Sequence, residues 1–181
     1  GVWGYIAACE ELREDFHAAG IEQAHIVTAT GSGGTQTGLT LGAALHDIPA
    51  TVWGVNVCDD AQYFVDKVAS DKEEWEQRYP GVPAVKVQAR VLDGYVGRGY
   101  GVADEAVFAT IAELGRLEGL VLDPVYTGKA FVGMVAEIAA GRFENCRDIV
   151  FVHTGGIFGV FPQRAGFDGV LDANNVLLDH S

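Results

Sequence analysis

Apolar residues recur along this chain with two different periods, one typical of amphipathic helices and one typical of buried strands. The helical period predicts helices over residues 4–19, 36–45, 60–79, 103–118 and about 130–140. Short apolar or alternating runs predict strands over residues 25–30, 51–57, 85–89, 120–122 and 149–152. Gly20 is placed to end the first helix. The run from Gly159 onward carries no strong pattern, so we expect it to wrap over the surface.

The same pattern indicates which faces of the elements are buried. The helix over 103–118 is expected to turn inward the side chains of Val107, Ile111, Leu114 and Leu117. The helix over 60–79 becomes highly charged at residues 71–74, which is typical of a solvated face. The strand over 85–89 alternates, so it has one polar face and is expected near an edge of the sheet.

Strands that alternate with helices along a chain are typical of an α/β fold. We predict an open, mainly parallel sheet with helices on both faces, formed by residues 1–181 as a single unit. Ligands of such sheets bind beyond the carboxyl ends of the strands. Three turns are predicted at that edge, at residues 31–35, 126–127 and 153–156, so we expect them to converge on one ligand.

Composition narrows the class of partner. The 181 residues are 49% hydrophobic and carry a formal net charge of −13, which allows one full core and argues against nucleic acid or an anionic membrane as a partner. We expect neither a membrane span nor a signal peptide. Cys9, Cys58 and Cys146 are widely spaced, which is typical of reduced cysteines in a cytoplasmic protein. The histidines lack metal-ligand spacing, so no metal site is predicted.

The most informative stretch is the run Gly-Ser-Gly-Gly-Thr at residues 31–35, between the first predicted strand and the next helix. Its glycines let backbone N–H groups converge at the positive end of a helix, which predicts a phosphate site with added hydroxyl donors from Ser32 and Thr35. A Walker loop would need a Gly-Lys pair, and Gln36 replaces the third glycine of the dinucleotide pattern. The alternative is a plain strand-to-helix turn.

Two other stretches carry residues suited to a site. Residues 93–101 hold four glycines and two tyrosines, too much glycine for a helix or a central strand. They form either a binding loop or a solvent loop whose tyrosines pack on the body. His153 follows the last predicted strand and is either a structural histidine or a catalytic one. Asp123, which precedes Pro124, is typical of a residue that caps a turn.

Taken in order, these motifs resemble one known family. Residues 30–35 are similar to its cofactor-phosphate loop, and similar segments follow at 99–101, 122–130 and 153–156. Over residues 1–161 the chain resembles the C-terminal half of the pyridoxal-phosphate enzymes grouped as 1-aminocyclopropane-1-carboxylate deaminase and D-cysteine desulfhydrase, which include L-cysteate sulfo-lyase. The resemblance implies the large-domain portion of a fold-type II enzyme, pyridoxal 5'-phosphate as cofactor, a small amino acid as substrate and a homodimer.

The resemblance implies cofactor contacts at individual positions. The residues implied to bind the cofactor are Gly31, Ser32, Gly33, Gly34, Thr35, Thr127 and Thr154. Among them, the backbone amides of Gly33 and Gly34 and the hydroxyl of Thr35 are implied to hold the phosphate. Either Thr127 or Thr154 is implied to face the pyridine nitrogen.

Catalytic roles are implied for Tyr100 and Tyr126, which would flank the cofactor and the substrate, one of them helping proton transfer. Members of the family that open the cyclopropane ring carry Glu where Thr127 stands and Leu where Thr154 stands. A carboxylate makes the ring a strong electron sink, whereas a threonine hydroxyl makes it a weaker one. The weaker sink suffices for α,β-elimination, so the resemblance places this chain nearer the desulfhydrase or sulfo-lyase branch.

The chain departs from the family in its lysines. The family's Schiff-base lysine lies upstream of the position that matches Gly1, and the lysines present here are Lys67, Lys72, Lys86 and Lys129. Lys129 belongs to a family motif but stands at a helix start. Lys67 and Lys72 are in a predicted charged helix, and Lys86 is on a predicted strand far from the motifs. Such an enzyme needs the amine to hold its cofactor and to move the α-proton. We therefore expect an inactive fragment, a cleaved piece or one part of a split enzyme, without its N-terminal half.

Two other functions compete with a desulfhydrase-like lyase or deaminase. A non-catalytic α/β module that binds a phosphate-bearing ligand fits the missing lysine, whereas the set of motifs favours the enzyme. A degenerate Rossmann dehydrogenase fits less well. Asn56 stands near the place where an acidic ribose partner is expected, and Gln36 interrupts the glycine pattern.

Overall fold

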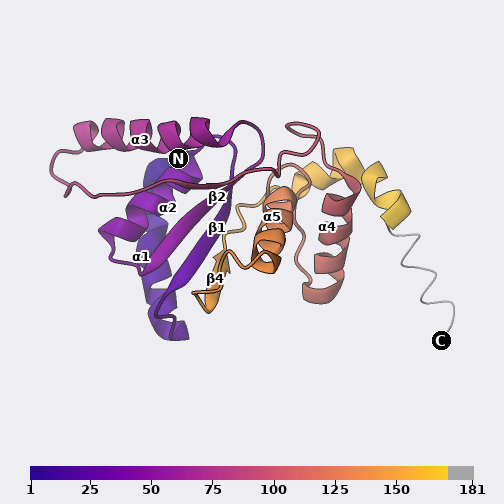
Figure 1. The fold of residues 1–181 in the computed structure, drawn as a ribbon, viewed down its shortest axis with the longest axis horizontal. Helices are drawn as coiled ribbons and strands as arrows, with labels where there is room; N and C mark the ends of the chain where they lie inside the picture. The colour runs from indigo at the N-terminus through magenta and orange to yellow at the C-terminus, as the bar shows by residue number, and fades with distance from the viewer. Residues whose placement is uncertain (171–181) are drawn as a thin grey trace.

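A four-stranded parallel sheet forms the centre of the fold in the computed structural model, which describes residues 1–170 (Figure 1). The strands lie in the order β3-β2-β1-β4 and are β1 (Ala24–Thr30), β2 (Ala50–Asn56), β3 (Arg90–Leu92) and β4 (Asp148–Phe151). Ala24 of β1 is in register with Ala50 of β2 and with Asp148 of β4. All carboxyl ends therefore lie at one edge, and the predicted parallel α/β sheet is confirmed.

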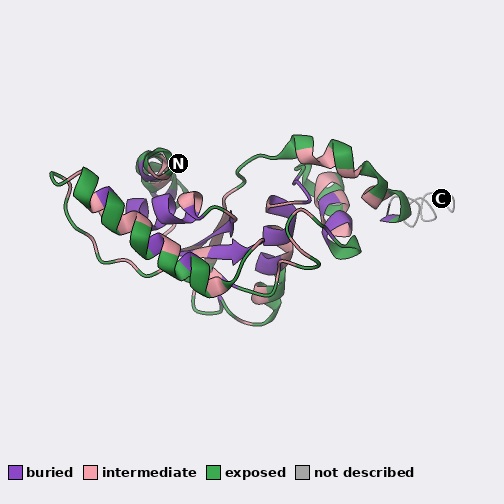
Figure 2. Cartoon of the chain, turned by 90° about the horizontal axis from the view of Figure 1, so that it is seen from above, coloured by how far each residue is buried: buried purple, intermediate pink, exposed green. Residues whose placement is uncertain are grey.

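Helices cover both faces of this sheet. Within residues 1–170 they are α1 (Val2–Ala19), α2 (Gly34–Leu45), α3 (Ala61–Arg78), α4 (Glu105–Glu118) and α5 (Thr127–Ala139), followed by the 3₁₀ helix η1 (Ile157–Phe167). Because neighbouring strand residues point to opposite faces, Ile26 and Val52 join the core beside α1 and α2, while Val27 and Val55 join the core beside α5. Buried residues gather on the strands and on the inner sides of the helices (Figure 2).

Two glycines let α1 and α2 approach each other closely. A Cβ atom on Gly38 would lie 2.6 Å from the Tyr5 Cβ, and one on Gly42 would lie 2.6 Å from the Cys9 Sγ. A crossing this close needs residues without side chains at the contact. α1 ends, as predicted, at Gly20, whose φ of 68° is left-handed.

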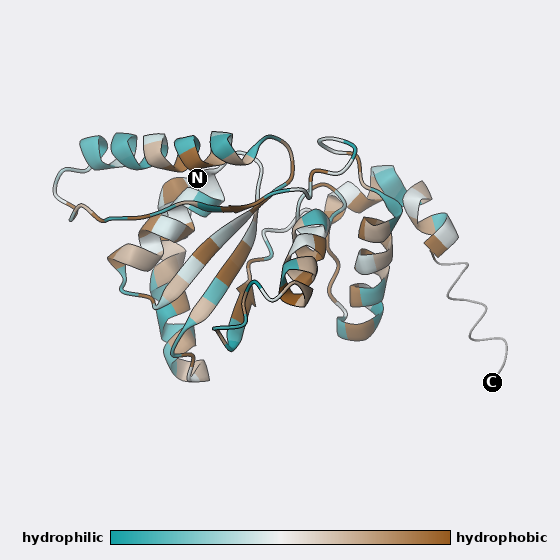
Figure 3. Cartoon of the chain, in the orientation of Figure 1, coloured by the Kyte–Doolittle hydropathy of each residue, from teal (hydrophilic) through white to brown (hydrophobic). Residues whose placement is uncertain are grey.

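The outer face of α3 is hydrophilic, as predicted (Figure 3). Its inner face buries Phe64, Val68 and Trp75. The charged stretch also forms an ion pair between Lys72 and Glu76, with 2.8 Å between Nζ and Oε1. None of the helices within residues 1–170 is both long enough and apolar enough to cross a membrane.

The prediction of a strand over 85–89 is wrong. Pairing with β2 begins only at Arg90, and the preceding residues run alongside as an extended segment without a ladder. The alternation is real but has another cause, because Val85 and Val87 pack against the cluster that contains Leu41 and Trp75. Contact with helices can produce the same period of two as a sheet does.

The prediction of a strand over 120–122 is also wrong. Leu122 is buried, but Leu120 and Val121 are 51% and 38% exposed, and the segment pairs with no strand among the described residues. The Val121 carbonyl instead contacts the His153 ring, with 3.1 Å between the oxygen and Nε2. An apolar run this short does not distinguish a strand from an extended connection.

Two helical segments differ from the prediction. α5 begins at Thr127, about one turn before the predicted start. In α4, Val107 and Ile111 are buried as predicted, but Leu117 is 59% exposed. At 3.6 residues per turn, Leu117 lies roughly 80° around the helix from Val107, so it stands on the flank of the buried face.

Residues 159–170 lie on the surface of α4, as predicted for this segment, but part of them is helical. The 3₁₀ helix η1 includes Pro162, and none of its residues is buried. It is attached by Phe167, whose ring packs edge-on against Phe108 with 5.0 Å between centroids. Residues 171–181 of the same predicted segment, His180 among them, lie outside the described residues.

Candidate functional site

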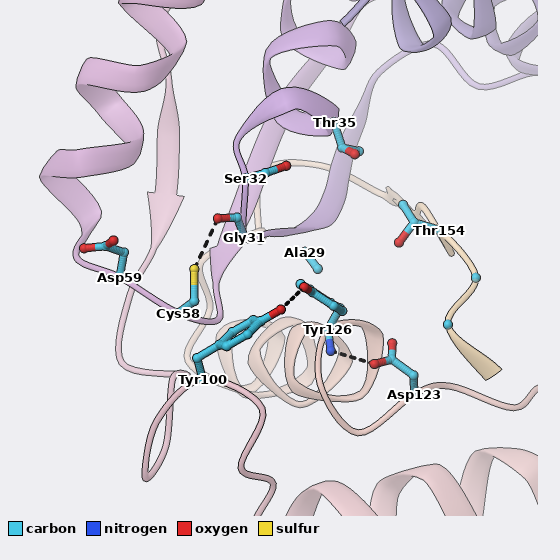
Figure 4. A pocket seen from close by; sticks show the side chains of 12 residues that line it. Ala29, Gly31, Ser32, Thr35, Cys58, Asp59, Tyr100, Asp123, Tyr126 and Thr154 are labelled. Atoms are coloured by element: carbon cyan, nitrogen blue, oxygen red, sulfur yellow. Dashed lines mark hydrogen bonds between the residues drawn. The ribbon is translucent and has the colours of Figure 1, made fainter. Parts of the chain in front are cut away.

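A cavity of about 730 Å³ opens at the carboxyl edge of the sheet. It is lined by residues that follow β1, β2 and β4, together with residues from the 93–101 loop and the start of α5 (Figure 4). The lining residues are Ala29, Gly31, Ser32, Thr35, Cys58, Asp59, Tyr100, Asp123, Tyr126, Thr154, Gly155 and Gly156. The three turns expected to converge on one ligand therefore do meet at one cavity.

The glycine-rich turn presents unsatisfied donors to this cavity. Gly33 is the N-cap of α2 in a left-handed conformation, and no side chain caps the helix. The first N–H that donates within α2 belongs to Thr37, which bonds the Gly33 carbonyl at 2.8 Å. The N–H groups of residues 34–36 thus have no acceptor within the helix, and Ser32 and Thr35 stand beside them at the cavity. This arrangement is suited to an anion.

Gln36 has a structural reason to replace a glycine. Its side chain is fully buried, and Nε2 donates to the Arg90 carbonyl at 2.8 Å. It fills the space above Gly54, where a Cβ atom would lie 2.1 Å from the Gln36 Oε1. Asn56 is also buried, so it is not placed to meet a ribose. Both observations weigh against a dinucleotide site.

Tyr100 and Tyr126 form one wall of the cavity. Tyr100 comes from the 93–101 loop and Tyr126 from the N-cap of α5, and their hydroxyl groups are hydrogen-bonded to each other. The hydrogen bond with Tyr100 and burial raise the pKa of Tyr126 to about 12. The Tyr126 hydroxyl is therefore protonated at neutral pH and can donate a hydrogen bond or a proton.

Asp123 holds the backbone at the start of α5, the helix whose N-cap is Tyr126. Its carboxylate accepts hydrogen bonds from the N–H groups of Val125, Tyr126 and Thr127 at 2.8–2.9 Å and from the Thr127 hydroxyl at 2.7 Å. This confirms the predicted capping role. Thr127 is fully buried and also accepts from the Asp123 N–H at 2.8 Å, so its hydroxyl does not line the cavity.

The turn after β4 brings Thr154 to the cavity. It is followed by Gly155 and Gly156, whose φ angles of 95° and 97° are left-handed. His153 is bound at both ring nitrogens, since Nδ1 accepts from the Gly155 N–H at 3.0 Å and Nε2 faces the Val121 carbonyl. A histidine held in this way by the backbone orders the turn, which favours the structural role for His153.

Sequence reasoning missed Cys58 and Asp59, although both line the cavity. They follow β2 directly, so the rule that ligands lie at carboxyl ends of strands could have identified them. The Cys58 Sγ donates to the Gly31 carbonyl at 3.2 Å, which ties this turn to the glycine-rich one. Burial, and then the neighbouring Asp59, raise the pKa of the Cys58 thiol. The thiol is therefore a donor to the loop rather than a thiolate.

The structure separates the residues implied by the resemblance into two groups. Gly31, Ser32, Thr35, Tyr100, Tyr126 and Thr154 line the cavity. Gly33 and Gly34 stand behind them in the same turn and offer only backbone groups, and Thr127 lies beneath the cavity wall. No lysine is among the residues that line this cavity.

Comparisons with known proteins show which family this chain is similar to. The model of a family described as pyridoxal-phosphate dependent enzyme matches residues 1–155. The chain is 33% identical to a bifunctional D-cysteine desulfhydrase/1-aminocyclopropane-1-carboxylate deaminase of Arabidopsis thaliana, over 90% of this chain and 40% of the relative. It is also 33% identical to a D-cysteine desulfhydrase of Klebsiella pneumoniae, over 91% of this chain and 49% of the relative.

A solved structure shares both the fold and much of the sequence. The crystal structure of an ACC deaminase homologue superposes with a TM-score of 0.75 at 33% identity, covering 94% of this chain and 49% of that one. The chain therefore spans about half the length of the relatives and of the structure that it matches.

Proposed function

We propose that this chain, which belongs to the pyridoxal-phosphate dependent enzyme family, is the cofactor-binding half of a lyase or deaminase that acts on a small amino acid. One observation carries the proposal: a single cavity joins uncapped helix N–H groups and the hydroxyls of Ser32 and Thr35 to Thr154 and a pair of tyrosines. The relatives named D-cysteine desulfhydrase and 1-aminocyclopropane-1-carboxylate deaminase support the reaction class.

The residues present fit the cofactor. Its phosphate would be held by the N–H groups at the start of α2 and by the hydroxyls of Ser32 and Thr35, with no lysine needed. When bound, pyridoxal phosphate supplies an electron sink that labilises bonds at the α-carbon of an amino acid. Thr154, exposed at the cavity, would offer the pyridine nitrogen a hydroxyl rather than a carboxylate, because Thr127 is buried and its hydroxyl already bonds Asp123.

A neutral hydroxyl at this position favours α,β-elimination over ring opening, since a weaker electron sink suffices for elimination. We therefore propose a substrate like D-cysteine, with a good leaving group on the β-carbon. The Tyr100–Tyr126 pair would place a proton at the cavity wall, because the Tyr126 hydroxyl keeps its proton at neutral pH and is hydrogen-bonded to the Tyr100 hydroxyl.

The amine that such an enzyme needs is not at this cavity. Among the lysines here, Lys129 bonds loop carbonyls, Lys67 pairs with Asp71 and Lys72 pairs with Glu76. We propose that the reactive lysine lies in an N-terminal half that precedes these residues, and that the chain alone is inactive. The complete enzyme, meaning both halves together, is proposed to be a homodimer in the cytoplasm, where free cysteines such as Cys58 stay reduced.

The test is the substrate preference of the complete enzyme. Elimination from D-cysteine releases pyruvate, sulfide and ammonia, whereas opening of 1-aminocyclopropane-1-carboxylate releases 2-oxobutanoate and ammonia. We expect kcat/KM to be larger for D-cysteine than for the cyclopropane substrate. Ring opening faster than elimination would contradict the assignment of the branch, and activity on neither would contradict the proposed function.

One observation favours a second candidate, a non-catalytic module that binds a phosphate-bearing ligand: no lysine lines the cavity. That candidate predicts saturable binding of pyridoxal phosphate or inorganic phosphate by the complete protein, without a covalent adduct and without turnover of any amino acid. The enzyme predicts an adduct that borohydride reduction makes permanent.

A further inference from the structure

The side chain of Lys129 makes a contact that the proposed function does not use. Lys129 stands in the first turn of α5 and is only 2% exposed. Its ammonium donates to the Val96 carbonyl at 2.7 Å and to the Gly99 carbonyl at 2.8 Å. Both carbonyls belong to the 93–101 loop, so one buried cation joins the helix that begins at Tyr126 to the loop that carries Tyr100.

A buried ammonium is costly to the fold unless its donors are satisfied. Within residues 1–170, no carboxylate lies within ion-pair distance of the Lys129 Nζ, so the loop carbonyls are its partners. Burial lowers the pKa of Lys129, and the charge of Asp104 opposes that shift. The contact is thus specific to a long side chain with several donors, which an apolar residue of similar size cannot replace.

The loop depends on such contacts for its position. Four glycines in it adopt left-handed or similar positive φ angles, at positions 94, 97, 99 and 101, and they offer no side chains for packing. Its start is held by a hydrogen bond of 2.9 Å from the Asn56 Nδ2 to Asp93. Its first tyrosine, Tyr95, donates to Glu137 at 2.9 Å. Next to Tyr100, the Gly99 carbonyl is bound by Lys129.

We infer that Lys129 is a positioning residue: by holding the carbonyls of Val96 and Gly99 it fixes the hydroxyl of Tyr100 against that of Tyr126 at the cavity wall. The effect on loop order follows from the contacts alone. The effect on turnover rests on the proposed function, in which the tyrosine pair handles a proton. Lys129 itself does not line the cavity, so it acts on the reaction only through Tyr100.

The first test measures loop order in the complete enzyme without reference to activity. Arg98 is exposed within the loop, so trypsin cleavage after Arg98 and hydrogen exchange over residues 94–101 both report its opening. Lys129→Met removes the donors and keeps an unbranched side chain. We expect cleavage and exchange to rise about tenfold, the change produced by losing about 1.4 kcal/mol of local stability. The matched control, Lys72→Met, breaks a surface ion pair on α3 and should leave both rates unchanged.

Unchanged rates in Lys129→Met would overturn the inference. Because an apolar variant at a buried position can fail to fold, Lys129→Gln, which keeps one donor group, serves as the second variant. It should give a rate between wild type and Lys129→Met, or above wild type if Lys129→Met does not fold. A rate equal to wild type in Lys129→Gln while Lys129→Met fails to fold would assign the lysine to the fold alone.

The second test is a double-mutant cycle on turnover. Lys129→Met should lower kcat about tenfold with a smaller change in KM, and Tyr100→Phe should lower kcat at least as much. If Lys129 acts through Tyr100, the double variant is no slower than Tyr100→Phe. Losses that multiply would overturn the positioning role. If the wild-type enzyme turns over no amino acid, the proposed function fails, while the proteolysis and exchange result still decides the role of Lys129.

Discussion

The hydroxyls of Tyr100 and Tyr126 meet in a hydrogen bond, and their rings cross edge to face with 5.9 Å between centroids. One tyrosine is on a glycine-rich loop and the other is the N-cap of α5, so the pair joins two segments that are far apart in the sequence. Three neighbours set this geometry: Gly31 leaves room for the Tyr126 ring, Asp123 fixes its backbone, and Lys129 fixes the loop.

Gly31 is predicted to tolerate no side chain. A Cβ atom there would lie 2.8 Å from the Tyr126 Cε1, so Gly31→Ala should displace the Tyr126 ring into the cavity and weaken binding of pyridoxal phosphate roughly tenfold or more. Gly4→Ala on α1 is the matched control, because a Cβ on Gly4 has no neighbour within 4 Å and Gly4 does not line the cavity. Titration of absorbance with cofactor measures both. Equal affinities would argue against the ring as a wall of the site.

Thr127 and Thr154 are predicted to differ in what they support. Thr127→Val removes two buried hydrogen bonds to Asp123 and should lower the free energy of unfolding by about 2–3 kcal/mol. Thr154 is exposed, so Thr154→Val should leave the free energy of unfolding within about 0.5 kcal/mol of wild type, while it changes the absorbance and affinity of the bound cofactor. Urea unfolding and cofactor titration separate the two effects. A change of cofactor absorbance in Thr127→Val at unchanged stability, with none in Thr154→Val, would contradict this division.

Gly156 is predicted to matter through Asp123. A Cβ atom on Gly156 would lie 2.8 Å from the Asp123 Cγ, and its φ is left-handed. Gly155 also has a left-handed φ, but a Cβ atom there would have no neighbour within 4 Å. Gly155→Ala therefore serves as the control for backbone strain alone. We expect Gly155→Ala to cost about 1–2 kcal/mol of stability and Gly156→Ala about 1–3 kcal/mol more. If the two variants are equally stable in urea, the contact with Asp123 does not constrain the turn.

Tyr126 is predicted to make stability depend on pH above neutrality. The hydrogen bond with Tyr100 and burial raise the pKa of Tyr126 to about 12 in the folded state, whereas an unfolded tyrosine has a pKa of about 10. The folded state therefore binds this proton more tightly. The stabilisation that this bound proton gives the folded state is complete below a pH of about 10 and is lost as the pH rises through about 12.

The measurement is the urea midpoint between pH 9 and pH 12 for wild type and Tyr126→Phe. The variant should show a flatter decline, because it lacks the group that titrates. Tyr63→Phe, on the exposed surface of α3, should decline as wild type does. Parallel curves for wild type and Tyr126→Phe would mean that the tyrosine pair does not retain its proton in this way.

Much of the fold could be predicted from the sequence, because its central strands and helices carry strong local patterns. Ile26 and Val27 are adjacent apolar residues that join the cores on opposite faces of β1, as expected of a strand covered from both sides. The failures concern segments whose pattern comes from a different partner. Val85 and Val87 alternate because they pack on helices, and Leu120 to Leu122 are apolar although they pair with no strand within residues 1–170.

The site could be predicted where backbone chemistry leaves a local mark. The glycine content of residues 31–35 predicts an anion site there, and the position of residues 153–156 after a buried strand predicts that they lie at the same edge of the sheet. Cys58 and Asp59 carry no such mark and reach the cavity only because β2 lies beside β1. The sequence likewise could not show that Thr127 points inward to Asp123 while Thr154 points outward, since that choice depends on how α5 begins.

The central claim is that these residues bind the cofactor while a lysine outside them holds it covalently. The direct measurement is to load the complete protein with pyridoxal phosphate, reduce it with borohydride, and locate the adduct by mass spectrometry of every polypeptide and its tryptic peptides. We predict one phosphopyridoxyl group, on a lysine outside residues 1–181. An adduct on Lys67, Lys72, Lys86 or Lys129, or no adduct at all, would contradict the claim.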